Sequence, residues 1–234
     1  MRGKDNKGLP AAGTSSADDV AAFLKAATHT APRAAGRGRL AFALDATFSR
    51  QPTWDLACGL QAELFSAAAD LGGLDVKLLY YRGASECKAS GWVEDPRTLG
   101  RLMGTITCQG GQTQIGRVLT HLEGEVERSG LKAAVFVGDA MEEDVDALCQ
   151  KAGRLGVLGL KLFVFQEGHD RRVEAAFREI ARLTGGAWCR FEPGAGEELR
   201  ALLRAVAAYA AGGRPALQAS REHGARLLLA ALRP

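Results

Sequence analysis

One carboxylate and two hydroxyls stand close together directly after a run of apolar residues. Asp45, Thr47 and Ser49 follow the segment Leu40–Leu44, at the point where a buried strand should end. Thr47 and Ser49 are two residues apart, so in extended backbone their side chains point the same way. Oxygen ligands that converge on one turn suit a hard divalent cation, and they favour Mg²⁺ over Zn²⁺. The spacing therefore predicts part of a metal site.

Two later segments carry oxygen atoms that could complete this site. A glycine pair leads to the hydroxyl of Thr113, and a second apolar run, Val135–Gly138, leads to the carboxylate of Asp139. Two carboxylates would balance the charge of one Mg²⁺, while the neutral hydroxyls leave the metal electrophilic. Mg²⁺ prefers six oxygens and usually keeps some waters. The predicted ligands are Asp45, Thr47, Ser49, Thr113 and Asp139.

Each of these residues also has an ordinary structural interpretation. Asp139 and Glu142 have the spacing of a capping box, and Thr113 could cap the helix that follows it. Thr47 and Ser49 are common in turns. The metal site is favoured because all five residues fall at matching places in one predicted topology.

That topology follows from short apolar runs that alternate with amphipathic segments. Strands are predicted over 40–44, 74–81, 87–93, 133–137, 160–165 and 187–191. The pattern indicates a doubly wound α/β domain: a mostly parallel six-stranded sheet of order 3-2-1-4-5-6, with strand 3 an antiparallel edge and helices on both faces. Ligands bind such sheets beyond the carboxyl ends of the strands, where the strand order reverses between strands 1 and 4. The loops that carry the five oxygens should meet there.

Three regions are predicted along the chain. Residues 1–38 form an N-terminal arm with one short helix, indicated by Ser16 and Asp19 at capping-box spacing. Residues 39–212 form the α/β domain. Gly212 and Gly213 break the last helix, and residues 213–234 form a C-terminal tail that we expect to cover core surface.

Composition narrows the class of protein. The 234 residues are 47% hydrophobic, enough for one substantial core, and the net charge of +3 is too small to indicate a nucleic-acid partner. No apolar run approaches the roughly 18 residues of a membrane span. Five scattered cysteines, without a C-x-x-C pair, indicate neither a zinc site nor a disulfide framework. We expect a cytoplasmic protein without a membrane span.

The arrangement of these residues resembles a von Willebrand factor type A (VWA) domain of the bacterial intracellular type. The D-x-T-x-S segment of Asp45–Ser49, the G-G-x-T segment ending at Thr113 and the aspartate Asp139 after the fourth strand match the metal-ion-dependent adhesion site of that family. Two positions depart from the family pattern. Thr47 stands where serine is usual, which keeps the oxygen, and Ala140 stands where glycine is frequent, which removes no ligand.

The resemblance implies a protein-binding module rather than an enzyme. Family members bind a carboxylate of a partner protein, from an aspartate or a glutamate, through bound Mg²⁺ or Mn²⁺. Intracellular bacterial members often work beside chaperones or AAA+ ATPases, so the resemblance implies a partner of that kind. Around the site we expect a rim made of Arg50, Gln112, Gln114 and Glu142, with Arg50 and the two glutamines facing the partner's carboxylate.

A Mg²⁺-dependent phosphatase of the haloacid dehalogenase type is the alternative. Those enzymes also use an aspartate after strand 1 and a later Gly-Asp segment followed by an acid, which Gly138, Asp139 and Glu143 or Asp144 imitate. They also need an acid/base aspartate two residues after the first one. Thr47 occupies that position here and cannot act as the general acid. The sequence therefore favours the binding module.

Overall fold

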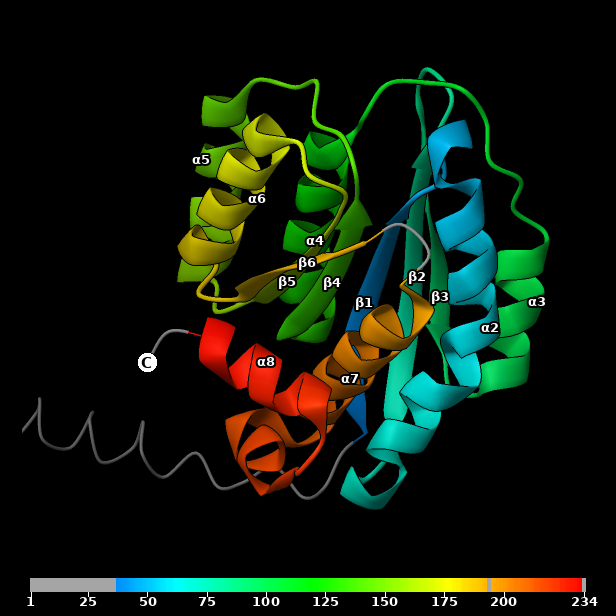
Figure 1. Ribbon diagram of the computed structural model, residues 1–234, viewed down its shortest axis with the longest axis vertical. Coiled ribbons are helices and arrows are strands. Elements are labelled where there is room, and N and C mark those ends of the chain that lie inside the picture. Colours follow the sequence, from blue (N-terminus) through cyan, green and yellow to red (C-terminus); the bar gives the residue numbers. More distant parts are fainter. Residues whose placement is uncertain (1–36, 193–194, 233–234) are drawn as a thin grey trace, which may run out of the picture. The chain divides into compact units, whose positions relative to one another are not determined.

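A six-stranded sheet forms the centre of the computed structural model, which describes residues 37–192 and 195–232 (Figure 1). The strands are β1 (Gly38–Asp45), β2 (Leu74–Arg82), β3 (Glu86–Val93), β4 (Ala133–Gly138), β5 (Lys161–Glu167) and β6 (Ala187–Phe191). Their order is β3-β2-β1-β4-β5-β6, and all neighbours are parallel except β3, which runs antiparallel to β2. The predicted fold class, strand order and antiparallel edge are confirmed.

Helices cover both faces of this sheet. They are η1 (Phe48–Arg50), α2 (Gln51–Ala68), η2 (Ala69–Leu71), α3 (Pro96–Gly104), α4 (Ile115–Ser129), α5 (Val145–Val157), α6 (Arg171–Leu183), α7 (Gly196–Ala219) and α8 (His223–Ala231). Side chains of α2, α3, α7 and α8 belong to the core on one face, and those of α4, α5 and α6 to the core on the other. None of the described helices is long and apolar enough to cross a membrane.

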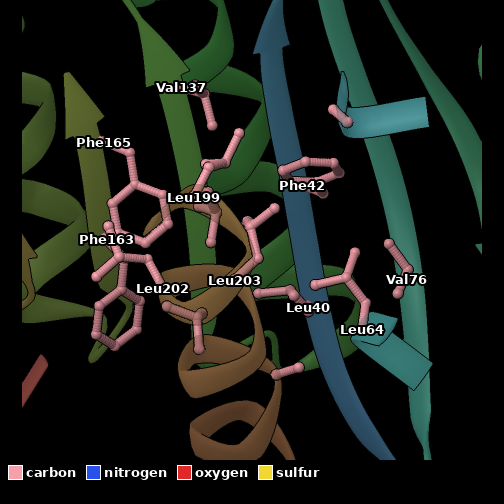
Figure 2. Close-up of a cluster of buried hydrophobic side chains, with 14 of the residues drawn as sticks. Leu40, Phe42, Leu64, Val76, Val137, Phe163, Phe165, Leu199, Leu202 and Leu203 are labelled. Carbon is pink, nitrogen blue, oxygen red and sulfur yellow. The ribbon is translucent and has the colours of Figure 1, made fainter. Parts of the chain in front are cut away.

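Strand β1 lies between the two cores because its side chains alternate between them. Leu40 and Phe42 pack with α2 and α7 (Figure 2), whereas Ala41 and Ala43 belong to the core beneath α4 and α5. All of these side chains are buried, which is typical of a central parallel strand. The same alternation sends Asp45, the last residue of β1, to the side of Ala41 and Ala43.

One predicted helix boundary differs from the structure, and another agrees with it. The helix that Thr113 could have capped begins at Ile115, one residue later than that role requires, and it ends at Gly130, which has a positive φ of 67°. Gly213 has a non-helical backbone conformation, with φ 66° and ψ −162°, so α7 consists of two helical segments that meet at this glycine. The predicted break of the last helix is therefore confirmed, and the second segment continues to Ala219.

The C-terminal segment packs against the same core as the sheet. Leu217, Leu228 and Leu232 are buried among side chains of α7 and the strands. The described part of the tail, residues 213–232, therefore covers core surface as expected. The short helix predicted around Ser16 lies outside the described residues, and the predicted regional boundaries remain a prediction.

Candidate metal centre

A pocket of about 230 Å³ opens at the carboxyl edge of the sheet, where strands β1 and β4 end. Three loops form it: the turn after β1, the segment before α4, which crosses the top of Figure 1, and the loop after β4. Its lining residues are Asp45, Thr47, Phe48, Ser49, Gly110, Gly111, Thr113, Ala140 and Glu142. Four of the five predicted ligands therefore share one pocket. The fifth, Asp139, immediately precedes the lining residue Ala140.

Hydrogen bonds fix the orientation of the Asp45 carboxylate. Oδ1 accepts from the backbone N–H of Thr47 at 2.8 Å, and Oδ2 accepts from the Tyr81 hydroxyl at 2.9 Å. Tyr81 is the register partner of Asp45 on β2, so the sheet itself sets this contact. Burial raises the pKa of Tyr81 well above its ordinary value, which keeps the phenol a donor.

The environment of Asp45 disfavours its negative charge in the absence of a cation. Burial raises the pKa of Asp45, the hydrogen bonds from Thr47 and Tyr81 oppose that rise, and the charge of Asp139 adds to it. Like charges near each other each disfavour the ionised form of the other. A divalent cation between them would relieve both effects.

The hydroxyls of Thr47 and Ser49 point toward each other, with their oxygens 3.2 Å apart. Thr47 is buried and Ser49 is exposed. Thr47 occupies the position before η1 but makes no side-chain capping bond. Its ordinary interpretation as a turn or capping residue therefore does not account for the direction of its hydroxyl.

Thr113 joins the second loop to the third through two reciprocal hydrogen bonds. Its N–H donates to the Glu142 carboxylate at 3.0 Å, and its hydroxyl accepts from the Glu142 N–H at 3.0 Å. A hydroxyl oxygen has two lone pairs, so one remains available to a metal. The helix cap predicted as the alternative for Thr113 is wrong: Gln114 precedes α4 and makes no side-chain cap.

The start of α4 is capped instead by a residue from another loop. Glu143 accepts hydrogen bonds from the backbone N–H groups of Ile115, at 2.5 Å, and of Gly116, at 2.8 Å. A carboxylate is favoured there because helix N-termini carry partial positive charge. Glu142 and Glu143 thus bind the loop after β4 to the loop before α4 at two adjacent points.

We expect Glu143→Gln to lower the free energy of unfolding by about 1–2 kcal/mol, because the charge on these two hydrogen bonds is lost. Urea denaturation of both proteins would measure the change. The exposed Glu127, on the same helix, gives the matched control Glu127→Gln, which should have little effect. Equal effects of the two variants would contradict the capping role.

The capping box predicted as the alternative for Asp139 is also wrong. Helix α5 begins at Val145, and its cap is Asp144, whose side chain accepts from the Ala147 N–H at 2.8 Å. Asp139 lies too far upstream to cap this helix.

Gly111 is required by a close approach between two loops. A Cβ atom on it would lie 2.0 Å from the carbonyl oxygen of Gly83, in the turn between β2 and β3. On the other side, the Gln109 N–H donates to the Ala46 carbonyl at 3.0 Å, which ties this loop to the turn after β1. Only glycine lets the chain pass through this gap and deliver Thr113 to the pocket.

Arg50 corrects one of the sequence predictions. It was expected at the solvated rim, facing a partner, but its side chain is 2% exposed, and it is not among the residues that line the pocket. Its Nη1 forms an ion pair with the carboxylate of Glu167, the last residue of β5, and the Thr53 hydroxyl donates to the same carboxylate. Burial lowers the pKa of Arg50, and the charges of Asp139 and Asp45 oppose that change. Arg50 is therefore an internal cation held by acids.

Asp139 has the environment expected of a metal ligand that also meets this internal cation. Its Oδ2 lies 3.8 Å from Arg50 Nη1. Its Oδ1 is buried and has no hydrogen-bond partner among the described residues, a costly state that a cation would relieve. Asp45, Asp139 and Glu167 together outnumber Arg50 by two charges, which one divalent cation would offset. The donor set therefore fits such an ion.

A metal bound here would depend on the hydroxyls as much as on the acids. Within residues 37–192 and 195–232, no three His, Cys, Asp or Glu side chains gather into a metal-binding group. A cation held by Asp45 and Asp139 would need the oxygens of Thr47, Ser49 and Thr113. Such an oxygen set suits Mg²⁺ or Mn²⁺ better than a soft metal.

The remaining rim residues divide into two kinds. Gln112 and Glu142 are exposed, as a rim residue should be. Gln114 is 6% exposed, and its amide donates to the carbonyls of Arg82 and Gly83. The predicted exposure of Gln114 is therefore wrong, because its side chain holds the turn between β2 and β3 next to the site.

Two residues of this centre were missed in the sequence: Tyr81 and Glu167. Glu143 was indicated as an acid near the site, but not as the cap of α4. Glu167 had a usable signal, since it lies two residues after the apolar run Leu162–Phe165, near a strand end as Asp139 does. Tyr81 had a weaker one, as the residue with a polar tip near the end of a buried strand. The role of Glu143 depends on how two loops dock, for which the sequence has no periodic signal.

Comparison with known proteins identifies the fold. No family model matches the chain, and no curated protein matches it in sequence. Among solved structures, it resembles the SpRpn10 VWA domain with a TM-score of 0.53 and 12% identity, covering 67% of this chain and 89% of that one. An aerotolerance-related membrane protein from Bacteroides fragilis gives a TM-score of 0.51 and 16% identity, covering 73% and 98%.

A further structure was solved with metal in its own site. Proximal thread matrix protein 1 from the mussel byssus, with zinc in its metal-ion-dependent adhesion site (MIDAS) motif, gives a TM-score of 0.57 and 16% identity. The match covers 74% of this chain and 45% of the mussel protein, so the chain spans less than half of that relative. Identities this low show the fold alone. The chain therefore has the fold of a von Willebrand factor type A domain.

Proposed function

We propose that this protein is a metal-dependent binding module, which holds Mg²⁺ or Mn²⁺ and engages an aspartate or glutamate of a partner protein. Asp45, Thr47, Ser49, Thr113 and Asp139 would hold the cation. The observation that carries the proposal is the shared pocket: four of these residues line it, and beside it Asp139 has a buried oxygen without a partner. The mussel relative, with zinc in its own motif, supports a metal at this place in the fold.

The pocket is open enough for a ligand from outside. Ser49 and Glu142 are exposed, and the pocket's volume of about 230 Å³ exceeds that of several waters at about 30 Å³ each. When bound, the cation would supply a positive charge and an open coordination position. A partner carboxylate suits such a position because it brings an oxygen ligand and negative charge together.

The charged residues around the pocket cannot by themselves attract a partner's carboxylate. Arg50 is buried and paired, so it cannot provide the positive charge for a partner's acid. Exposed Glu142 would repel a carboxylate in the absence of metal. Attraction must therefore come from the cation, and binding should disappear when a chelator removes it.

Titration calorimetry with Mn²⁺ tests the ligand set. Thr113→Ala should weaken metal binding by at least about tenfold, because it removes a ligand oxygen and the acceptor for the Glu142 N–H. Thr113→Ser keeps the oxygen and should bind within a few-fold of the wild type. The matched control is Thr120→Ala, on the exposed side of α4, which should not change binding. Absence of any divalent binding by the wild type would refute the proposal.

A further inference from the structure

Phe48 is an exposed aromatic side chain built into the wall of the candidate metal pocket. Its side chain is 68% exposed. The other large apolar side chains that are exposed in the described residues are Leu71, Val145, Val157 and Leu158, so Phe48 is the only aromatic ring among them. An exposed aromatic ring beside a binding pocket is a frequent anchor for a protein partner.

Phe48 is placed at the pocket by its neighbours in the chain and by the second loop. It stands between the predicted ligands Thr47 and Ser49 and opens the short helix η1. The ring also lies beside the second loop, since a Cβ atom on Gly110 would be 3.3 Å from its Cδ2. The ring therefore lies at the pocket, beside the loop that carries Thr113.

The fold itself gives no reason for an aromatic residue here. With most of its surface in water, Phe48 adds little to the core, and neither of the two core clusters includes it. The other walls of the pocket are small or glycine: Gly110, Gly111 and Ala140. Phe48 is thus the one large apolar surface that a ligand in this pocket could cover.

We infer that Phe48 selects the partner: it binds a segment in which the acidic residue stands beside a bulky apolar side chain. The inference rests on the proposed function, since the carboxylate must first bind the cation. The apolar neighbour would cover the exposed face of the ring, which adds affinity that a carboxylate alone cannot supply. Glu142, at the rim, makes a second acid in the partner unfavourable.

Selection from a random peptide library tests this inference with the full chain immobilised. Phage-displayed peptides are bound in MnCl₂ and eluted with EDTA. We expect the eluted peptides to contain aspartate or glutamate with a large apolar residue within two positions. Acidic peptides without such enrichment would overturn the inference and leave the proposed function standing. If EDTA releases no acidic peptide, the proposed function fails and the inference with it.

The role of the ring is then measured with one selected peptide. Phe48→Ala should weaken peptide binding by about tenfold or more, and Phe48→Leu by less, because leucine keeps an apolar surface. Both variants should bind Mn²⁺ as the wild type does. Val157→Ala removes another exposed apolar side chain, 89% exposed at the end of α5, and should change nothing. Unchanged peptide affinity in Phe48→Ala would overturn the inference.

Discussion

Glu167→Met is expected to lower the free energy of unfolding by about 3–5 kcal/mol, because it leaves a buried guanidinium without its main partner. Arg50 is 2% exposed and Glu167 is 8% exposed, so water cannot replace the lost carboxylate. Asp139 remains 3.8 Å away, too far for a good hydrogen bond. Thr53 also loses the acceptor for its hydroxyl. Urea denaturation in metal-free buffer would measure the change.

A double variant separates the effect of the unpaired charge from the effect of changing the size and shape of the side chains. Arg50→Met combined with Glu167→Met removes both charges, so it should be more stable than Glu167→Met alone. The exposed pair of Arg182 and Glu179, on α6, provides the control, and Glu179→Met should have a much smaller effect because solvent screens that pair. If the double variant loses as much free energy of unfolding as Arg50→Met and Glu167→Met lose together as single variants, then Arg50 and Glu167 do not stabilise each other.

The fold was predictable because its signals are periodic. The alternation between the two cores along Leu40–Leu44 and the apolar stripes of α5 and α6 need only local sequence. The five predicted ligands could also be identified from the sequence, since each follows a strand end or a glycine pair at one edge of the sheet. The predicted strand order alone brings the loops that carry these residues to one region of the sheet edge.

The misplaced residues share one physical cause. Arg50 and Gln114 were expected in solvent because polar side chains beside a pocket usually are. In the structure, each finds a partner beneath the surface: Glu167 for Arg50, and backbone carbonyls for Gln114. A buried charge is tolerated only when another element supplies its counter-charge. That pairing joins β5 to the turn after β1, and no local pattern reports it.

Asp139→Asn is expected to abolish metal-dependent stabilisation while leaving the metal-free fold largely intact. With Mg²⁺ at about one hundred times its dissociation constant, the wild type should gain about 2.7 kcal/mol, and the variant should gain almost nothing. The loss follows from the buried Oδ1, which has no other partner among the described residues. Chemical denaturation of both proteins, with MgCl₂ and with EDTA, would measure how much Mg²⁺ stabilises each of them.

The metal-free stability of the same variant tests whether Asp139 belongs to the site or to the scaffold. No helix cap is lost, because Asp144 caps α5. Asparagine removes the repulsion from Asp45 and also the attraction to Arg50, which keeps Glu167 as its partner. These opposed changes should leave the free energy of unfolding within about 1 kcal/mol of the wild type. The control Asp146→Asn, exposed in the first turn of α5, should keep the full response to Mg²⁺. If Asp139→Asn is unfolded even without metal, Asp139 serves the scaffold, and the five-ligand site loses the residue that completes it.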